Sequence, residues 1–217
     1  MTAQAMPELV DAIDEGAPSI AAEKTRRRLT GKQGAVVERL VDAAAQEARL
    51  RGYDGTTVRS AAKRAGVAPA TAYTYFASKD HLLAEVLWRR MRTLPRSVID
   101  PDASALDRVA RELRVLGLFM ADDTTLAAAC TAALLGSGPD VTAVRERFGS
   151  EVNARLALSL GDNADHGVLR ALDLAWSGAM LWAGMGHMAF TDVPDALIGV
   201  ASLLLRNSSL IETHEGM

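Results

Sequence analysis

The chain has 217 residues, of which 49% are hydrophobic and 24% are charged, with a net charge of −3 and one cysteine. This length allows one or two domains with a buried core, and the hydrophobic share argues against wholesale disorder. No apolar run reaches the roughly 18 residues of a membrane span, and residues 1–23 lack the features of a secretion signal. The lone Cys130 excludes an internal disulfide, so we expect a cytoplasmic protein with this thiol in its core.

The charge is distributed unevenly along the chain. Residues 24–96 hold 16 basic and 6 acidic residues, residues 1–23 hold 5 acidic and no basic residues, and residues 97–217 hold 8 basic and 16 acidic residues. A basic block in an otherwise acidic chain is typical of a surface that meets a polyanion. A basic surface that meets only solvent is the alternative.

Ala and Leu are abundant and strand-forming residues are few, which predicts an all-α fold. We expect an acidic disordered tail and a basic arm over residues 1–32. The arm, residues 24–32, either contacts a nucleic-acid backbone or minor groove or serves as a flexible linker. A first domain is predicted over residues 33–93, a larger helical domain over 94–210, and a flexible tail over 211–217.

Two helices are predicted before a glycine turn. Apolar positions over residues 34–51 recur at helical spacing, and Gly52 ends that helix. Thr56 and Thr57 offer an N-cap for a second helix over residues 58–65, and Gly66 then supplies a tight turn.

Two further helices follow the turn. Pro69 suits the first turn of a third helix, where its missing N–H has no partner to lose. Ser78 caps a fourth helix that continues to about Thr93, and Pro95 and Pro101 bracket a break that we take as the domain boundary. Two short helices around a glycine turn predict a helix-turn-helix, which is a DNA-binding motif.

The base-reading residues follow from the geometry of this motif, because the first turn of its second helix meets base edges in the major groove. Pro69, Ala70 and Thr71 are therefore predicted to lie nearest the bases. Ala70 and the methyl group of Thr71 can contact a thymine methyl group, and the Thr71 hydroxyl can form a hydrogen bond. Arg59 is the candidate for a guanine contact.

Four other side chains are candidates for phosphate contacts. Tyr73 and Tyr75 can reach phosphates through their hydroxyls, and Thr57 combines a capping role with such a contact. Lys79 lies at the start of the fourth helix, where its ammonium and nearby N–H groups can hold one phosphate. The alternatives are packing inside the small domain for Tyr73 and a plain surface position for Lys79.

Five longer helices are predicted in the second domain, over residues 103–120, 124–135, 141–160, 167–190 and 194–207. An enzyme is disfavoured, because the candidate side chains have no metal-ligand or catalytic-triad spacing and no glycine-rich phosphate loop is present. These side chains are Cys130, Asp162, Asp165, His166 and His187. We expect no cofactor, no metal site and no membrane partner.

The first domain resembles the tetracycline-repressor (TetR) family of bacterial regulators over about residues 34–92. The matching residues are Gly52-Tyr53, Thr56-Thr57-Val58, Ala61-Ala62, Ala65-Gly66-Val67, Thr71, Tyr73, Tyr75-Phe76 and Ser78-Lys79-Asp80-His81-Leu82-Leu83. The family often has Gly at the position of Ala70 and Leu at that of Ala72. The resemblance implies base-facing or nearby positions for Arg59, Pro69, Ala70, Thr71 and Tyr73, and phosphate-binding positions for Thr57, Tyr75 and Lys79.

The resemblance also implies a homodimer formed by the last two helices, here about Val168–Phe190 and Pro194–Asn207. Small residues of the first of these, including Gly184 and Gly186, would let another helix approach, while Trp and Met provide contact area. Packing within one chain is the alternative. The dimer-interface candidates are Ser177, Gly178, Trp182 and Met185.

An effector pocket is implied among the helices that the family places around its ligand cavity. Flexible methionines and sparse charge suit an apolar ligand, although each residue taken alone is more often a plain core residue. The candidates are Leu116, Phe119, Met120, Leu134, Leu135, Phe148, Leu156, Trp176 and Met180. The layout is loosely similar to that of the family's actinobacterial regulators of lipid and steroid metabolism.

These observations predict a ligand-responsive transcriptional regulator, most simply a repressor. It would bind a palindromic double-stranded DNA operator as a homodimer and be released by a small apolar effector. The alternative is a DNA-binding regulator without a small-molecule ligand, controlled by contacts with other proteins.

Overall fold

The computed structural model describes residues 31–161 and 165–212, with side chains up to Arg206. Within these ranges every regular element is helical and no strand occurs, as the composition predicted. The predicted acidic tail and nearly all of the basic arm lie outside the described residues. None of the described helices is long and apolar enough to cross a membrane.

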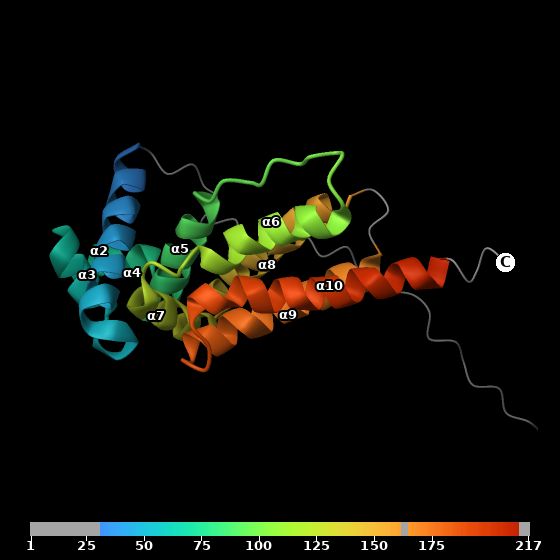
Figure 1. The fold of residues 1–217 in the computed structure, drawn as a ribbon. Helices are drawn as coiled ribbons and strands as arrows, with labels where there is room; N and C mark the ends of the chain where they lie inside the picture. Colours follow the sequence, from blue (N-terminus) through green and yellow to red (C-terminus); the bar gives the residue numbers. More distant parts are fainter. Residues whose placement is uncertain (1–30, 162–164, 213–217) are drawn as a thin grey trace, which may run out of the picture.

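Three helices form a small bundle at one end of the molecule, which we call the head (Figure 1). They are α2 (Gly31–Gly55), α3 (Val58–Ala65) and α4 (Pro69–Tyr75). Helix α2 begins three residues before the predicted start, and its regular part ends at Gly52, which has a φ of 65° that favours glycine. Alanines of α2, α3 and α4 are fully buried between the helices, as Ala44, Ala61 and Ala72 illustrate.

Helix α5 (Lys79–Arg92) joins the head to the larger C-terminal part. Ser78 caps it by accepting a hydrogen bond from the N–H of His81 at 3.0 Å, as the sequence indicated. The helix packs against α2 on one side and against α7 and α8 on the other. Most of its length is therefore buried, unlike a linker that only spans two domains.

The remaining helices form the body, which lies beside the head in Figure 1. They are α6 (Ala105–Leu118), α7 (Thr124–Leu134), α8 (Pro139–Leu160), α9 (His166–Gly184), the short 3-10 helix η1 (Phe190–Asp192) and α10 (Val193–Glu212). Helix α10 packs along α6 and α9. At the α6–α10 crossing a Cβ on Gly117 would lie 2.9 Å from Pro194 Cγ, so only glycine allows this approach.

The predicted helix over residues 167–190 is wrong at its C-terminal end. Helix α9 ends at Gly184, and Gly186 takes a φ of 82°, in the left-handed region that favours glycine. The chain then turns, and Phe190 begins η1. The sequence did not reveal this turn, because apolar residues continue after Gly186 although they no longer belong to the helix.

A buried ion pair fastens the segment after α5 to the body. The Arg155 guanidinium donates to Glu112 Oε1 at 3.1 Å, and both side chains are 3% exposed. The same guanidinium donates to the backbone carbonyls of Leu94 and Pro95, each at 3.0 Å. Charge and hydrogen-bonding groups are thus satisfied together, as buried charges require.

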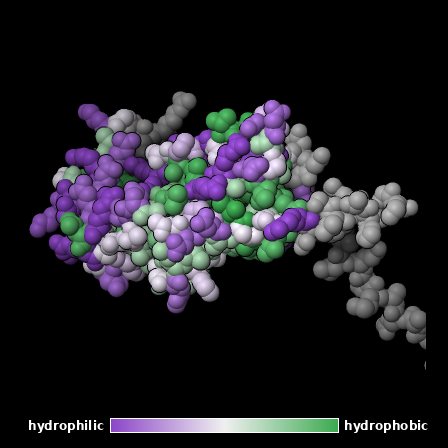
Figure 2. All heavy atoms as spheres, in the orientation of Figure 1, coloured by the Kyte–Doolittle hydropathy of each residue, from purple (hydrophilic) through white to green (hydrophobic). Residues whose placement is uncertain are grey.

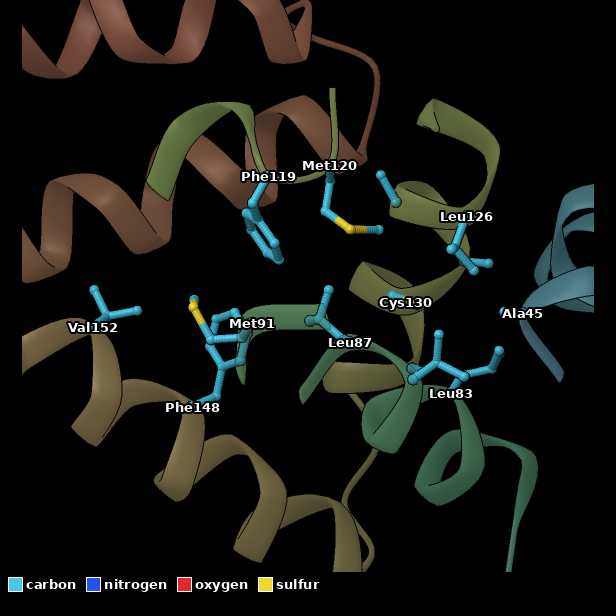
Figure 3. Close-up of a cluster of buried hydrophobic side chains, with 14 of the residues drawn as sticks. Ala45, Leu83, Leu87, Met91, Phe119, Met120, Leu126, Cys130, Phe148 and Val152 are labelled. Carbon is cyan, nitrogen blue, oxygen red and sulfur yellow. The ribbon is translucent and has the colours of Figure 1, made fainter. Parts of the chain in front are cut away.

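The core continues from α5 into the body without a break. In Figure 3 side chains of α5, including Leu87 and Met91, face Phe119 and Phe148 of the body. Cys130 of α7 is fully buried nearby, as expected, and burial raises the pKa of its thiol to about 12. This thiol therefore stays protonated and acts as a small core residue.

Candidate DNA-binding surface and effector cavity

Local hydrogen bonds set the geometry of the helix-turn-helix. The Thr57 hydroxyl accepts from the Ser60 N–H at 2.9 Å, and the Ser60 hydroxyl accepts from the Thr57 N–H at 3.0 Å, which is a capping box. Gly66 follows α3 with φ 64° and ψ 37°, the left-handed conformation of a helix C-cap. Pro69 then opens α4. The turn is built as the sequence indicated.

The predicted base-reading residues are all accessible to solvent. Arg59, Pro69, Ala70 and Thr71 are all exposed. Ala68, at the N-cap of α4, forms no side-chain capping bond, so the first turn of this helix faces solvent uncovered. Other residues of the motif, such as Ala61, are fully buried.

The predicted phosphate-binding residues lie at different depths. Tyr73 is 50% exposed, so its ring does not pack in the head as the alternative required. Tyr75 is half-buried against the core. Lys79 is also half-buried, because its Nζ lies 3.7 Å from the centroid of the Tyr53 ring and donates to the Tyr53 carbonyl at 3.2 Å. The protein thus holds this ammonium in a defined place.

Tyr53 organises this corner of the head. Its hydroxyl donates to Asp80 Oδ1 at 2.6 Å, and this bond raises the pKa of the Tyr53 hydroxyl to about 12, with burial as a second cause. Sequence reasoning matched Tyr53 to a motif but gave it no role. Nothing in the one-dimensional pattern shows that it supports Lys79 from 26 residues away.

Not every basic side chain near the turn is available to DNA. Arg64 donates to Glu47 Oε1 of α2 at 2.6 Å, and Glu47 is only 3% exposed. Burial raises the pKa of the Glu47 carboxyl, but the Arg64 bond and neighbouring arginine charges outweigh it, so the net shift is downward. Arg64 therefore stabilises the head, while Lys63 beside it is exposed.

The body contains a cavity of about 260 Å³. Seven of the nine predicted pocket residues line it: Phe119, Met120, Leu134, Leu135, Phe148, Trp176 and Met180. The other two, Leu116 and Leu156, are fully buried core residues outside this lining. Leu116 still supports the wall, because its carbonyl accepts from the Trp176 indole N–H at 3.3 Å.

Aromatic rings form one side of this cavity. The ring centroid of Phe148 lies 6.0 Å from that of Phe119 and 5.6 Å from that of Trp176. Phe119, which directly follows α6, and Phe148 of α8 approach each other in Figure 3. The exposed lining residues Leu135 and Arg145 mark the mouth. An apolar interior with few polar groups suits a small apolar molecule.

Sequence reasoning missed the other lining residues. They are Leu87, Ala127, Thr131, Arg145, Gly149, Ser177, Leu181 and Phe190. Leu87 belongs to α5, and its helical pattern gives no sign that it faces a cavity of the body. Ser177, which was predicted for the dimer interface, also lies in this lining.

Two sets of contacts connect the cavity walls with α5. Arg90 of α5 donates to the Phe119 carbonyl at 2.7 Å and pairs with Asp122. On the other wall, the turn after α7 packs against the start of α5, because a Cβ on Gly136 would lie 3.0 Å from Asp80 Oδ2. Both walls therefore contact the helix that carries Lys79.

A further polar contact between α5 and α8 is buried. His81 is 6% exposed, packs edge-on against Phe76, and lies with Nδ1 3.8 Å from Asp140 Oδ2. Glu85 is paired with Arg147 at 3.2 Å. Burial lowers the pKa of His81, and the charges of Asp140 and Glu85 only partly oppose this shift.

Helices α9 and α10 present an apolar surface with a groove of about 340 Å³. Trp182 and Gly178 line the groove, and nothing lies within 4 Å of a Cβ built on Gly178. Trp182 and Met185 are 57% and 51% exposed. Figure 2 shows hydrophobic surface over part of α10 and mainly hydrophilic surface over the head. Gly184 does not belong to this surface, because it packs against Thr131 of α7.

A basic helix-turn-helix on a helical body with an apolar cavity defines a class of DNA-binding transcriptional regulators. Residues 40–86 match the sequence family described as bacterial regulatory proteins, tetR family. An uncharacterised HTH-type transcriptional regulator of Mycobacterium tuberculosis is 42% identical over 180 residues, covering 82% of this chain and 84% of that protein. The chain belongs to the tetR family and is a regulator rather than an enzyme.

Other relatives agree with this assignment. The HTH-type transcriptional repressor KstR of Rhodococcus jostii is 29% identical over 194 residues, covering 87% of this chain and 86% of KstR. A crystal structure of a TetR transcriptional regulator from Rhodococcus sp. RHA1 superposes with a TM-score of 0.67 at 23% identity, covering 82% of this chain and 99% of that one. The multidrug binding protein EbrR complexed with ethidium has a TM-score of 0.57 at 24% identity, covering 77% and 96%. Both structures share the fold.

Proposed function

We propose that this regulator acts in the cytoplasm as a homodimeric repressor that releases a palindromic operator when a small, mainly apolar effector fills the body cavity. The observation that carries the proposal is the position of α5. Lys79 lies at its head end, and Leu87, about 12 Å further along the helix axis, lines the cavity. One rigid helix therefore contacts both the DNA-binding surface and the effector site.

The exposed side chains of the head support the DNA part of the proposal. Thr71 and Arg59 provide hydrogen-bonding groups for base edges, while Lys79 and Tyr73 are placed for phosphates. Arg59 has no hydrogen bond or ion pair within the described residues. It is therefore free to contact a base, unlike Arg64.

The surface of α9 and α10 supports the homodimer. Leu174, Trp182 and Leu203 are between 57% and 64% exposed, which is costly for large apolar side chains in water. A second copy would cover them and place two heads about 34–36 Å apart, as a palindrome in successive major grooves requires. The repressor KstR supports the direction of regulation.

The cavity supports an effector and argues against a regulator controlled only by protein contacts. A regulator of the second kind has no need for an apolar space lined by Phe148, Trp176 and Met180. EbrR, which shares the fold, is a multidrug binding protein complexed with ethidium. The effector would weaken DNA binding by binding a state with a different head spacing more tightly.

The proposal is tested by selecting DNA on the purified protein from a pool of random duplexes. We expect enrichment of a palindrome, with binding that weakens steeply as salt rises. Lys79→Ala should weaken binding to all sequences and reduce the salt slope by about two, one for each subunit. Arg59→Ala should relax sequence preference at one position of each half-site, at about 1–3 kcal/mol.

Arg114→Ala is the matched control, because Arg114 is exposed on α6 of the body, away from the head. It should leave the affinity and the salt slope unchanged. Selection that enriches no sequence, or binding that Lys79→Ala leaves unaltered at every salt concentration, would overturn the proposed function.

A further inference from the structure

The cavity has one charged residue at its mouth. Among the described lining residues Arg145 is the single ionisable one, and no aspartate or glutamate lines the cavity with it. The other polar side chains of the lining are Thr131 and Ser177, which carry hydroxyls. A cavity with an apolar interior and one cation at the edge fits a molecule with an apolar body and one anionic group.

Arg145 is at present satisfied by neutral groups. It donates to the Leu134 carbonyl at 2.6 Å, to the Gly136 carbonyl at 3.3 Å and to the Thr142 hydroxyl at 3.1 Å. The two carbonyls belong to the C-terminal end of α7 and its following turn, where helix carbonyls lack intrahelical partners. Arg145 therefore caps this helix end from α8.

An anionic group is a stronger partner for a guanidinium than a carbonyl. We propose that Arg145 recognises an anionic group of the effector, such as a carboxylate or sulfonate, and exchanges its carbonyl partners for it. This proposal rests on the proposed function of the cavity as an effector site. It narrows the effector class from apolar molecules to amphipathic anions.

The exchange has a direct consequence for the head. The turn that Arg145 caps packs against Asp80 through Gly136, and Asp80 holds the Tyr53 hydroxyl at 2.6 Å. Tyr53 in turn positions the Lys79 ammonium by its ring and its carbonyl. Removal of the cap loosens the turn and, through these contacts, the lysine placed for a phosphate.

Two fluorescent probes separate the anion contact from apolar burial. 1-Anilinonaphthalene-8-sulfonate carries one sulfonate, and N-phenyl-1-naphthylamine has the same rings without the charge. We expect Arg145→Gln to weaken sulfonate-probe binding about fivefold, the size of an exposed ion pair, and to leave the uncharged probe unchanged. Arg145→Lys keeps the positive charge, so its affinity for the sulfonate probe should fall less than that of Arg145→Gln.

Two controls locate the effect. Ala127→Leu, which fills part of the cavity from its wall, should weaken both probes, and Arg114→Gln should change neither. If Arg145→Gln weakens both probes equally, Arg145 only supports the fold, and if it changes neither, it does not contact the anion. Either result overturns the proposal while the effector cavity stands. If the wild type binds neither probe, the assignment of the cavity as an effector site is overturned as well.

Discussion

The head and the body solve the packing problem in opposite ways. In the head, fully buried alanines such as Ala48, Ala61 and Ala62 bring the helices into close contact. In the body, large side chains such as Phe148 and Trp176 meet around a space of about 260 Å³. The head therefore holds its reading surface in one geometry, whereas the body keeps room for another molecule.

The two regions also differ in the surface they present. The head exposes polar and basic side chains over α3 and α4, while the body exposes Trp182 and Leu203 on α9 and α10. The first surface suits a polyanion and the second suits an apolar partner. Helix α5 lies between the two regions, so its contacts decide how one influences the other.

The largest effect is expected where the chain leaves α5 for the body. Arg155→Ala leaves the buried Glu112 carboxylate without its guanidinium, which should cost about 3–5 kcal/mol of unfolding free energy. Urea unfolding measures this loss. The exposed Arg114→Ala should stay within about 0.5 kcal/mol of the wild type. A loss below about 1 kcal/mol for Arg155→Ala would mean that this ion pair does not stabilise the body and the segment that it fastens.

The next effect tests the apolar surface of the body. Trp182→Glu places a charge in the α9–α10 groove. We expect the dissociation constant of the dimer to rise about 100-fold, as it does for a residue at the centre of an interface. Sedimentation equilibrium measures the dissociation constant. Leu50→Glu is the control, since Leu50 is 68% exposed on the head. Equal dissociation constants for Trp182→Glu and the wild type would place the dimer interface elsewhere.

The packing difference itself can be tested with one substitution in each region. Ala61→Leu forces a larger side chain into the close-packed head and should cost about 1–3 kcal/mol. Ala127 is buried to a similar degree but lines the cavity. Ala127→Leu should therefore lower the unfolding free energy less than Ala61→Leu does. Alanine and leucine are both strong helix formers, which removes propensity as a cause. Thermal unfolding measures the stability of both variants. Equal losses of stability would show that the head is not packed more closely than the cavity wall.

The smallest effect concerns pH at the contact between α5 and α8. Burial lowers the pKa of His81, so near pH 6.5 the unfolded chain binds a proton more readily than the folded protein does. The stability contribution is complete above this pH and falls as the pH drops below it, by at most about 1.4 kcal/mol at pH 5.5. His81→Gln should remove this part of the slope. The unfolding free energy of the wild type and of His81→Gln is measured at pH 7.5 and at pH 5.5. An equal change between the two pH values in both proteins would show that His81 does not cause the pH dependence.

The sequence predicted the head better than the body because the head depends on local signals. The Thr57 cap, the Gly66 turn and the Pro69 helix start each follow from residues close in the chain. Side chains that act on distant partners were beyond this reasoning. Tyr53 beneath Lys79 and the pairing of Arg64 with Glu47 depend on how helices pack.

The body was predictable as a set of helices but not as a cavity. Helical periodicity identifies apolar residues, yet it does not distinguish a cavity wall from solid core, as Leu116 and Leu156 illustrate. Arg145 was missed for the same reason, since an arginine on an amphipathic helix has the pattern of a solvent-facing residue. The end of α9 at Gly184 was hidden by apolar residues that continue into a loop.

In the proposed mechanism, filling the body cavity changes the affinity of the head for DNA. Its most direct test is the dissociation constant for the selected palindrome with and without saturating 1-anilinonaphthalene-8-sulfonate, measured at fixed salt. We expect the probe to weaken DNA binding at least about fivefold in the wild type, within the usual range of coupling between two sites. An unchanged DNA dissociation constant, with the cavity shown to be full by probe fluorescence, would contradict the account.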